Sequence, residues 1–351
     1  MRAGPQPQDA PRTELLPEIL AQDVVDEIDA YLGRVPHGTS CLATGSLIEG
    51  FGNSNSDIDL YVIQPSGSTA TKPIAIGIRD SRYVDVEYLN LAALHKLADA
   101  FRDTTPDEAP QALTLRDFDR YYRLSVAARL KVTGEAEAVL DRCSSERSAT
   151  LFARWSLAQA AAYLARASVA RALREVPRAV ILARQAAVWR ATSQLADEGE
   201  AYPRLKWVTV KAARRFGADT PGYRSCLQGY DVTPPGLESA LVALRERIPP
   251  DTATGGAGDA VSWTLAEDVA TVTDGTGLHL IRGSRSITRI EGLARMLIGH
   301  LTEGASWPSA VERTARQLAV SPGDVRTTAT PLMRELADAG YVVSSVQGVQ
   351  R

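Results

Sequence analysis

The stretch LATGSLIEGFGNSNSDIDLYVI, residues 42–63, decides the fold of this chain. A short apolar run leads into Gly45 and Ser46, and a second apolar run begins with Asp57 and Asp59. Side chains alternate along a strand, so the two aspartates share one face and the isoleucine and leucine beside them share the other. We therefore expect a β-strand with one core face and one face that carries chemistry.

Two carboxylates on one face repel each other, and a fold accommodates such a pair where a divalent cation lies between them. The aspartate pair therefore favours a metal site at the head of the strand. The alternative is a polar strand end in which Asp57 only caps a turn. The surrounding residues decide between these two interpretations.

The quoted stretch resembles a known signature. The residues Gly45-Ser46, Gly50 and Ser56-Asp57-Ile58-Asp59 match the Gly-Ser … Ser-Asp-x-Asp pattern of the polymerase beta-like nucleotidyltransferase superfamily. This resemblance implies a small mixed sheet with helices on one side, and magnesium held by the two aspartates. It also implies that the Gly-Ser pair opens a helix whose backbone amides hold the triphosphate, with Ser56 beside the nucleotide. A helix N-terminus that a glycine lets a ligand approach closely is a suitable anion site.

A third carboxylate is expected on a neighbouring strand. Residues 74–79 and 82–88 are β-rich runs separated by two residues, which predicts a hairpin. On the second run Asp85 and Glu87 share a face. The resemblance calls for a third acidic ligand that also takes the proton of the attacking hydroxyl, and we assign Asp85 to it. Glu87 is a possible acceptor-side residue; the alternative is that both are ordinary exposed acids.

Composition limits the class of protein. The chain has 351 residues, 44% hydrophobic and 23% charged, which is typical of a globular protein with two or three domains. A net charge of −3 argues against long nucleic acid as the substrate. Three widely spaced cysteines indicate reduced thiols and predict a cytoplasmic protein. No apolar run is long enough for a membrane helix.

The expected fold is α+β with three domains. We predict a disordered tail at 1–13, a nucleotidyltransferase domain at 14–110 that begins with a helix at 14–32, a helical bundle domain at 111–248, a linker at 249–260 and a C-terminal domain at 261–344. Helical periodicity in the middle domain predicts helices at 118–132, 135–141, 148–170, 179–197, 204–216 and 237–248.

Lys206 is the candidate cation of the middle domain. It follows Pro203 at the start of a predicted helix, with further basic residues close behind. A cation there could reach a β- or γ-phosphate and neutralise charge on leaving pyrophosphate. The alternative is the solvated face of an amphipathic helix. Trp207, next in the sequence, is expected in the core.

The C-terminal segment predicts a winged helix-turn-helix. Strands are expected at 261–265, 269–272 and 278–281, helices at 287–301, 310–318 and 325–339, and a last strand after Gly340. The glycine-turned hairpin at 273–277 and the run from Leu332 to Val342 resemble PqqD-like peptide-recognition domains. That resemblance implies that an extended leader peptide binds as an added strand. A generic winged helix used for dimerisation, or for DNA binding, is the alternative.

These observations predict an enzyme. It would use two Mg²⁺ ions to move a nucleoside monophosphate, AMP from ATP, onto a peptide or other hydroxyl-bearing acceptor, as in ribosomal peptide natural-product biosynthesis. One alternative is a small-molecule adenylyltransferase of the antibiotic-modifying type. Another is a non-catalytic winged-helix regulator that binds DNA or peptide; the intact Ser-Asp-x-Asp sequence argues against it.

Overall fold

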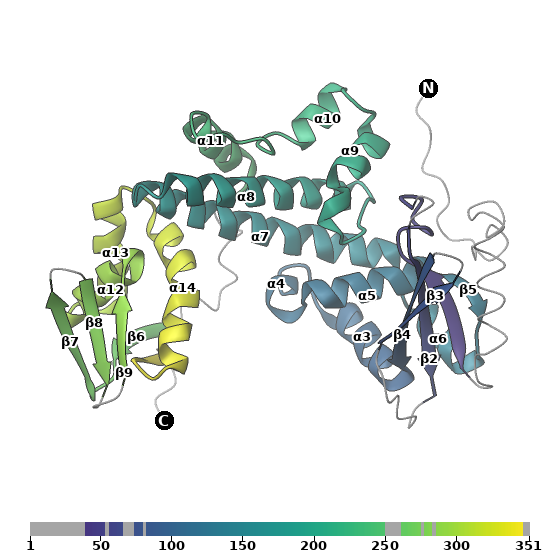
Figure 1. Ribbon diagram of the computed structural model, residues 1–351, viewed down its shortest axis with the longest axis horizontal. Helices are drawn as coiled ribbons and strands as arrows, with labels where there is room; N and C mark the ends of the chain where they lie inside the picture. The colour runs from purple at the N-terminus through teal and green to yellow at the C-terminus, as the bar shows by residue number, and fades with distance from the viewer. Residues whose placement is uncertain are drawn as a thin grey trace. The chain divides into compact units, whose positions relative to one another are not determined.

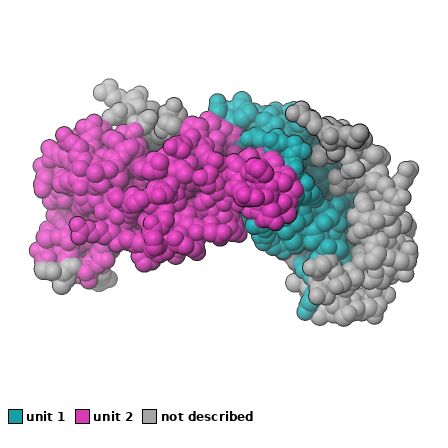
Figure 2. Space-filling model, turned by 90° about the horizontal axis from the view of Figure 1, so that it is seen from above, with its two compact units in different colours: residues 1–153, 195–215 teal, residues 154–194, 216–351 magenta. Residues whose placement is uncertain are grey.

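The computed structural model describes residues 39–52, 56–65, 74–79, 82–249, 261–274, 277–282 and 286–346. The chain divides into two units: unit 1 is residues 1–153 with 195–215, and unit 2 is residues 154–194 with 216–351 (Figure 2). The predicted tail and first helix, and the linker from residue 250 onward, lie outside the described residues. The predicted domain boundaries remain predictions.

The sheet of unit 1 contains β1 (Ser40–Thr44), β2 (Ile58–Gln64), β3 (Ile74–Arg79), β4 (Arg82–Asn90) and β5 (Ala128–Lys131). Within the described residues its order is β3-β4-β2-β1-β5. Strands β2 and β4 are parallel and the other neighbours are antiparallel, so the sheet is mixed and the aspartate strand lies at its centre. The β3–β4 pairing confirms the predicted hairpin.

Helices occupy most of residues 91–247. They are α3 (Leu91–Asp103), α4 (Ala109–Ala112), α5 (Leu115–Val126), α6 (Gly134–Leu140), α7 (Ser145–Ala172), α8 (Val176–Asp197), the 3-10 turn η2 (Leu205–Trp207), α9 (Val208–Phe216), α10 (Pro221–Cys226) and α11 (Leu237–Arg247). The predicted helix at 118–132 is wrong beyond Val126. The chain there becomes β5, because these residues pair with the open edge of β1, a tertiary contact that overrides helical propensity. None of the helices in the described part of the chain has the length and apolar character needed to span a membrane.

Both faces of the sheet are covered by apolar side chains. Leu60 and its alternate neighbours Ile58 and Val62 pack with Val84 and Val86 on one face. On the other face, Tyr61 and Ile63 pack against α3, α5 and α6. The sequence predicted functional side chains along this second face of β2. Only Asp59, near the start of the strand, is polar there. From Tyr61 onward the face is core, with the Tyr61 side chain 1% exposed.

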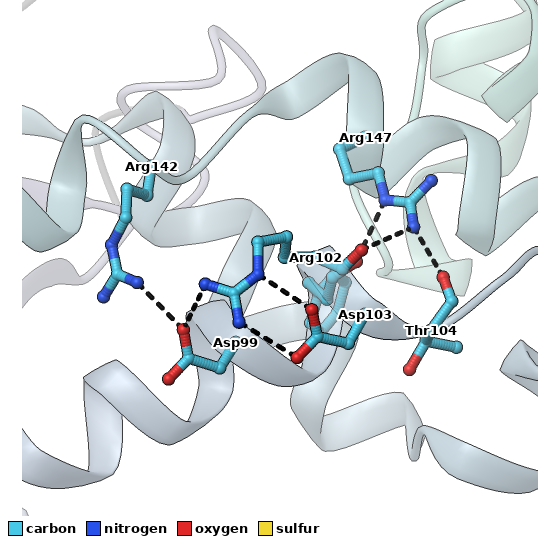
Figure 3. Close-up of polar contacts among 7 residues, drawn as sticks. Asp99, Arg102, Asp103, Thr104, Arg142 and Arg147 are labelled. Carbon is cyan, nitrogen blue, oxygen red and sulfur yellow. Dashed lines mark hydrogen bonds and ion pairs between the residues drawn. The ribbon is translucent and has the colours of Figure 1, made fainter.

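A polar cluster fixes the end of α3 to the start of α7 (Figure 3). Arg147 donates from Nε to the carbonyl of Phe101 at 2.9 Å and from Nη2 to the carbonyls of Arg102 and Thr104. These carbonyls belong to the last turn of α3, which has no further helical donors. Asp99 accepts from the guanidinium groups of Arg102 and Arg142, each at 2.9 Å. The cluster holds α3 against the helices that cover the sheet.

The C-terminal part of unit 2 combines strands and three helices (Figure 1). The elements are β6 (Val261–Leu265), β7 (Val269–Asp274), β8 (Gly277–Arg282), β9 (Ser286–Ile290), α12 (Gly292–Thr302), α13 (Trp307–Leu318), α14 (Pro322–Asp338) and β10 (Val342–Val346). Strands β7-β8-β9 form one sheet and β10 pairs with β6. Buried side chains form one core between the two sheets and the three helices; they include Trp263 of β6, Leu280 of β8, Leu297 of α12 and Met333 of α14. The predicted helix at 287–301 is wrong at its start, where β9 pairs with β8.

Candidate active site

A cavity of about 460 Å³ in unit 1 brings the predicted residues together. Six of them line it: Ser46, Ser56, Asp57, Asp59, Asp85 and Lys206. Four residues that the sequence did not assign to the site complete its wall: Arg123, Tyr202, Arg204 and Trp207. We call this cavity the aspartate pocket. Its side chains come from the loop after β1, from β2 and the two residues before it, from β4, from α5 and from the segment before α9.

Gly45 is required by the position of Asp59. It has a φ of +83°, and a Cβ at this position would lie 1.9 Å from Asp59 Oδ2. Any other residue would therefore strain the backbone and displace the aspartate. After it, residues 46–50 form hydrogen-bonded turns, in which Ser46 O accepts from the amides of Phe51 and Gly52 at 2.9 Å. The helix that the family resemblance implied here is absent from these described residues.

Asp59 and Asp85 stand side by side on adjacent parallel strands. They are partners in the β2–β4 register, and the next pair with the same orientation is Tyr61 with Glu87. Neighbouring strands lie about 4.8 Å apart, so the two carboxylates share one patch of the sheet surface. Asp57 precedes β2 and is exposed, whereas Asp59 and Asp85 are half-buried. The predicted two-residue alternation therefore places three carboxylates around one cavity.

Arg123 is the principal counter-charge in the aspartate pocket. Its guanidinium lies 2.8 Å from Asp59 Oδ1 and 3.8 Å from Asp119 Oδ2, and it stacks over the Tyr61 ring at 4.8 Å. The side chain is only 8% exposed. Helix α5 places it there through the Thr114–Asp117 capping box, which fixes the helix start. A buried guanidinium thus compensates part of the charge on the aspartates.

Burial governs the acidity of these carboxylates. It raises the pKa of Asp59 above its ordinary value, although the Arg123 guanidinium opposes the shift. The pKa of Asp85 is also raised, first by burial and then by the charges of Asp57 and Asp59. Each raised pKa means that the ionised form is disfavoured where it stands. The pocket therefore contains two carboxylates whose neutral form is favoured first of all by burial.

The segment before α9 supplies the cations opposite the aspartates. Arg204 donates to both carboxylate oxygens of Asp119, at 2.8 and 2.6 Å, and Lys206 Nζ lies 5.2 Å from the Trp207 ring centroid. Trp207 is half-buried and stacks on Phe51 at 5.3 Å. It therefore lines the pocket, which corrects its prediction as an ordinary core residue.

The donor set suits magnesium, but its arrangement is not that of a closed site. Hard carboxylate oxygens are the ligands that Mg²⁺ prefers, and the charges of Asp57 and Asp59 add to the burial that raises the pKa of Asp85. Among the described residues, however, no three histidine, cysteine or acidic side chains are grouped as metal ligands. The ion pair with Arg123 turns Asp59 toward α5 instead. The chemistry of the residues fits the ion.

Glu87 lies outside the aspartate pocket. Its carboxylate pairs with Arg120 of α5, and it lines a neighbouring cavity. Sequence reasoning missed Arg123 because nothing within helix α5 distinguishes it from Arg116 and Arg120, which precede it. Arg204 carried a signal, since it stands with Lys206 in a basic stretch after Pro203.

Comparison with known proteins gives a distant likeness. The fold is similar to that of a nucleotidyltransferase-like protein from Exiguobacterium sibiricum 255-15, with 12% identity and a TM-score of 0.36. The likeness covers 66% of this chain and 76% of that one. No family model and no curated protein matches the sequence. A likeness this distant shows no activity, so the function of the chain has to be inferred from the residues of the aspartate pocket.

Proposed function

We propose that this chain is a magnesium-dependent nucleotidyltransferase that moves AMP from ATP onto a hydroxyl group and releases pyrophosphate. The observation that carries the proposal is the lining of one pocket by three carboxylates, two serines and three cations. Carboxylates that repel each other in a cavity also lined by cations suit a ligand made of metal ions and phosphates. A solvated polar surface would not need such a cavity.

Asp57, Asp59 and Asp85 would hold the Mg²⁺ ions, which supply positive charge to both the attacking and the leaving oxygen. In the reaction the acceptor oxygen bonds to the α-phosphorus while the bond from that phosphorus to the bridging oxygen breaks. Pyrophosphate leaves with the electron pair of that bond. The Asp85 carboxylate takes the hydroxyl proton, a role that suits an acid whose pKa is raised.

The cations and serines would position the nucleotide. Ser46 and Ser56 would donate to phosphate oxygens from the aspartate side of the pocket. Arg204 and Lys206 would neutralise charge that develops on the leaving pyrophosphate. Gly45 keeps room for Asp59, so the loop can lie against the aspartate strand without a side chain between them.

The acceptor is proposed to be a peptide held by the C-terminal part of unit 2. Strand β7 is one of the two outer strands of the β7-β8-β9 sheet, with Val272 46% exposed, and an outer strand offers unpaired backbone groups to an extended peptide. Val272→Lys should then weaken peptide binding without changing nucleotide binding. DNA binding in place of peptide binding would show a steep loss of affinity with salt, about 0.9 log units per phosphate contact for each log unit of salt concentration.

Product analysis tests the proposed reaction. The full chain, ATP and Mg²⁺ would be incubated with hydroxyl-bearing peptides and small molecules, and the products examined by mass spectrometry with pyrophosphate measured in parallel. We expect an acceptor carrying one added AMP, and pyrophosphate in equal amount. Both should be absent with Asp57→Asn. Release of inorganic phosphate in place of pyrophosphate would contradict nucleotidyl transfer.

A further inference from the structure

A second cavity adjoins the aspartate pocket within unit 1. It has a volume of about 680 Å³, and Arg123 and Arg204 line both cavities. Tyr61 and Glu87, which also line the second cavity, are the register pair next to Asp59 and Asp85 on the same face of β2 and β4. Two residues along a strand span about 7 Å. A small molecule in the second cavity would therefore lie within reach of a nucleotide held at the aspartates. We call this second cavity the Arg116 cavity.

The charges of the Arg116 cavity are mainly positive. Its charged lining consists of Arg116, Arg120, Arg123, Arg204, Glu87 and Asp119. Glu87 pairs with Arg120, and Asp119 pairs with Arg204 and Arg123. Arg123 also pairs with Asp59 of the aspartate pocket, so four guanidinium groups meet three carboxylates, and Arg116 projects from the exposed first turn of α5. Guanidinium groups bind carboxylate and phosphate through paired hydrogen bonds.

The remaining wall is apolar. Leu115, Pro203 and Leu205 line the cavity. An apolar wall with a few charged groups is typical of a site for an organic ligand. A polycationic ligand would meet the arginines as like charges, so the cavity is unsuited to it.

We propose that the Arg116 cavity is the acceptor site, and that the acceptor carries a carboxylate or phosphate group beside the hydroxyl that receives the nucleotide. This proposal rests on the proposed transferase function. Arg116 and Arg120 bind the anionic group, which directs the hydroxyl toward the aspartate pocket. For a peptide acceptor, the anionic group is an acidic side chain, a phosphorylated residue or the terminal carboxylate.

Ligand-observed NMR on the full chain tests the proposal with four simple probes. Glycerol 3-phosphate and 3-hydroxybutyrate carry a hydroxyl with a phosphate or a carboxylate, glycerol is neutral, and choline is cationic. We expect one or both anionic probes to bind, and glycerol and choline not to bind. The preferred anion identifies the acceptor group as phosphate or carboxylate. Binding of choline in preference to the anions would overturn the proposal.

Variants assign the binding to the cavity. Arg116→Ala should weaken anion binding roughly fivefold or more, and Arg116→Lys should restore part of it. Arg102→Ala is the matched control, because Arg102 is an exposed, ion-paired arginine of unit 1 outside the cavity. An equal loss in Arg116→Ala and Arg102→Ala would overturn the assignment.

Nucleotide binding separates this proposal from the transferase proposal. Arg116→Ala should leave the affinity for Mg²⁺–ATP unchanged. A loss of Mg²⁺–ATP affinity without a loss of anion binding would mean that the cavity serves the nucleotide, and would overturn the acceptor site. The protein could bind the anionic probes through Arg116 and yet bind no Mg²⁺–ATP. This result would overturn the transferase function and support the anion site.

Discussion

Arg123 Nη2 lies 2.8 Å from Asp59 Oδ1, so a nearly buried guanidinium faces one carboxylate of the proposed metal site. The same guanidinium reaches Asp119, which in turn accepts from Arg204. A chain of alternating charges therefore links the aspartate strand to the segment that carries the other cations. Magnesium bound at Asp59 would replace part of the charge compensation that Arg123 provides.

Removing Arg123 should destabilise the fold. Arg123→Met should lower the free energy of unfolding by about 3 kcal/mol, because it leaves the half-buried Asp59 carboxylate without its nearest cation. Combining it with Asp59→Asn should cost less than the sum of the single changes, by roughly 1–3 kcal/mol. Urea unfolding of the two single variants and the double variant measures this coupling. Additive losses would show that the two groups do not interact.

Gly45 and Gly50 form a matched pair of positions on one loop. Both have positive φ, but a Cβ at Gly45 meets Asp59, whereas a Cβ at Gly50 meets nothing within 4 Å. Gly50→Ala should cost about 1 kcal/mol of stability from backbone strain and keep Mg²⁺–ATP affinity. Gly45→Ala should abolish that affinity because it displaces Asp59. Calorimetry measures the Mg²⁺–ATP affinity of both variants. Equal affinities would show that Gly45 is not part of the site.

Asp85 should carry a pH-dependent stability penalty. Burial raises the pKa of Asp85 in the folded protein above its ordinary value of 3.8. The free energy of unfolding therefore falls as pH rises above 3.8, and it stops falling once pH exceeds the raised pKa. Asp85→Asn should therefore raise the melting temperature at pH 7, and its advantage should shrink as pH falls toward 4. An advantage that grows in acid would mean that the native pKa is lowered.

The two strand acids should differ in catalysis. Asp85→Asn should abolish nucleotide transfer, because Asp85 lines the aspartate pocket, whereas Glu87→Gln should be milder, because Glu87 pairs with Arg120 in the neighbouring cavity. Initial rates of pyrophosphate release measure both. The opposite order would make Glu87 the third site carboxylate.

The thiols of Cys41 and Cys143 should be unreactive in the native protein. Burial raises the pKa of each to about 12, and the thiolate is the reactive form. Iodoacetamide at pH 8 should label neither cysteine until the chain is unfolded in urea. Peptide mass spectrometry of native and unfolded samples reads each site separately. Rapid native labelling of either thiol would show that it is accessible and easily ionised.

The sheet and the carboxylate positions could be predicted because they depend on local patterns. Alternation fixed which side chains of β2 and β4 share a face, and two β-rich runs with a two-residue gap fixed the hairpin. Strands β5 and β9 could not be predicted in this way. Both lie in segments with helical periodicity, and both form because a neighbouring strand offers an open edge.

The counter-charges of the site depend on tertiary contacts. Arg123 pairs with Asp59 although it lies 64 positions further along the chain. Arg204 pairs with Asp119 from a segment that follows α8 but belongs to unit 1. Neither pairing leaves a mark in the local sequence. The sequence therefore predicts the carboxylates and Lys206, and the structure adds Arg123 and Arg204.

Calorimetric titration of the full chain with ATP, with and without Mg²⁺, tests the central claim most directly. If Asp57, Asp59 and Asp85 hold Mg²⁺ with a nucleotide, ATP should bind only when Mg²⁺ is present, and Asp57→Asn should abolish that binding while Arg102→Ala binds as the unchanged protein does. ATP binding that is the same without Mg²⁺, or undiminished in Asp57→Asn, would contradict a magnesium-dependent nucleotide site at the aspartates.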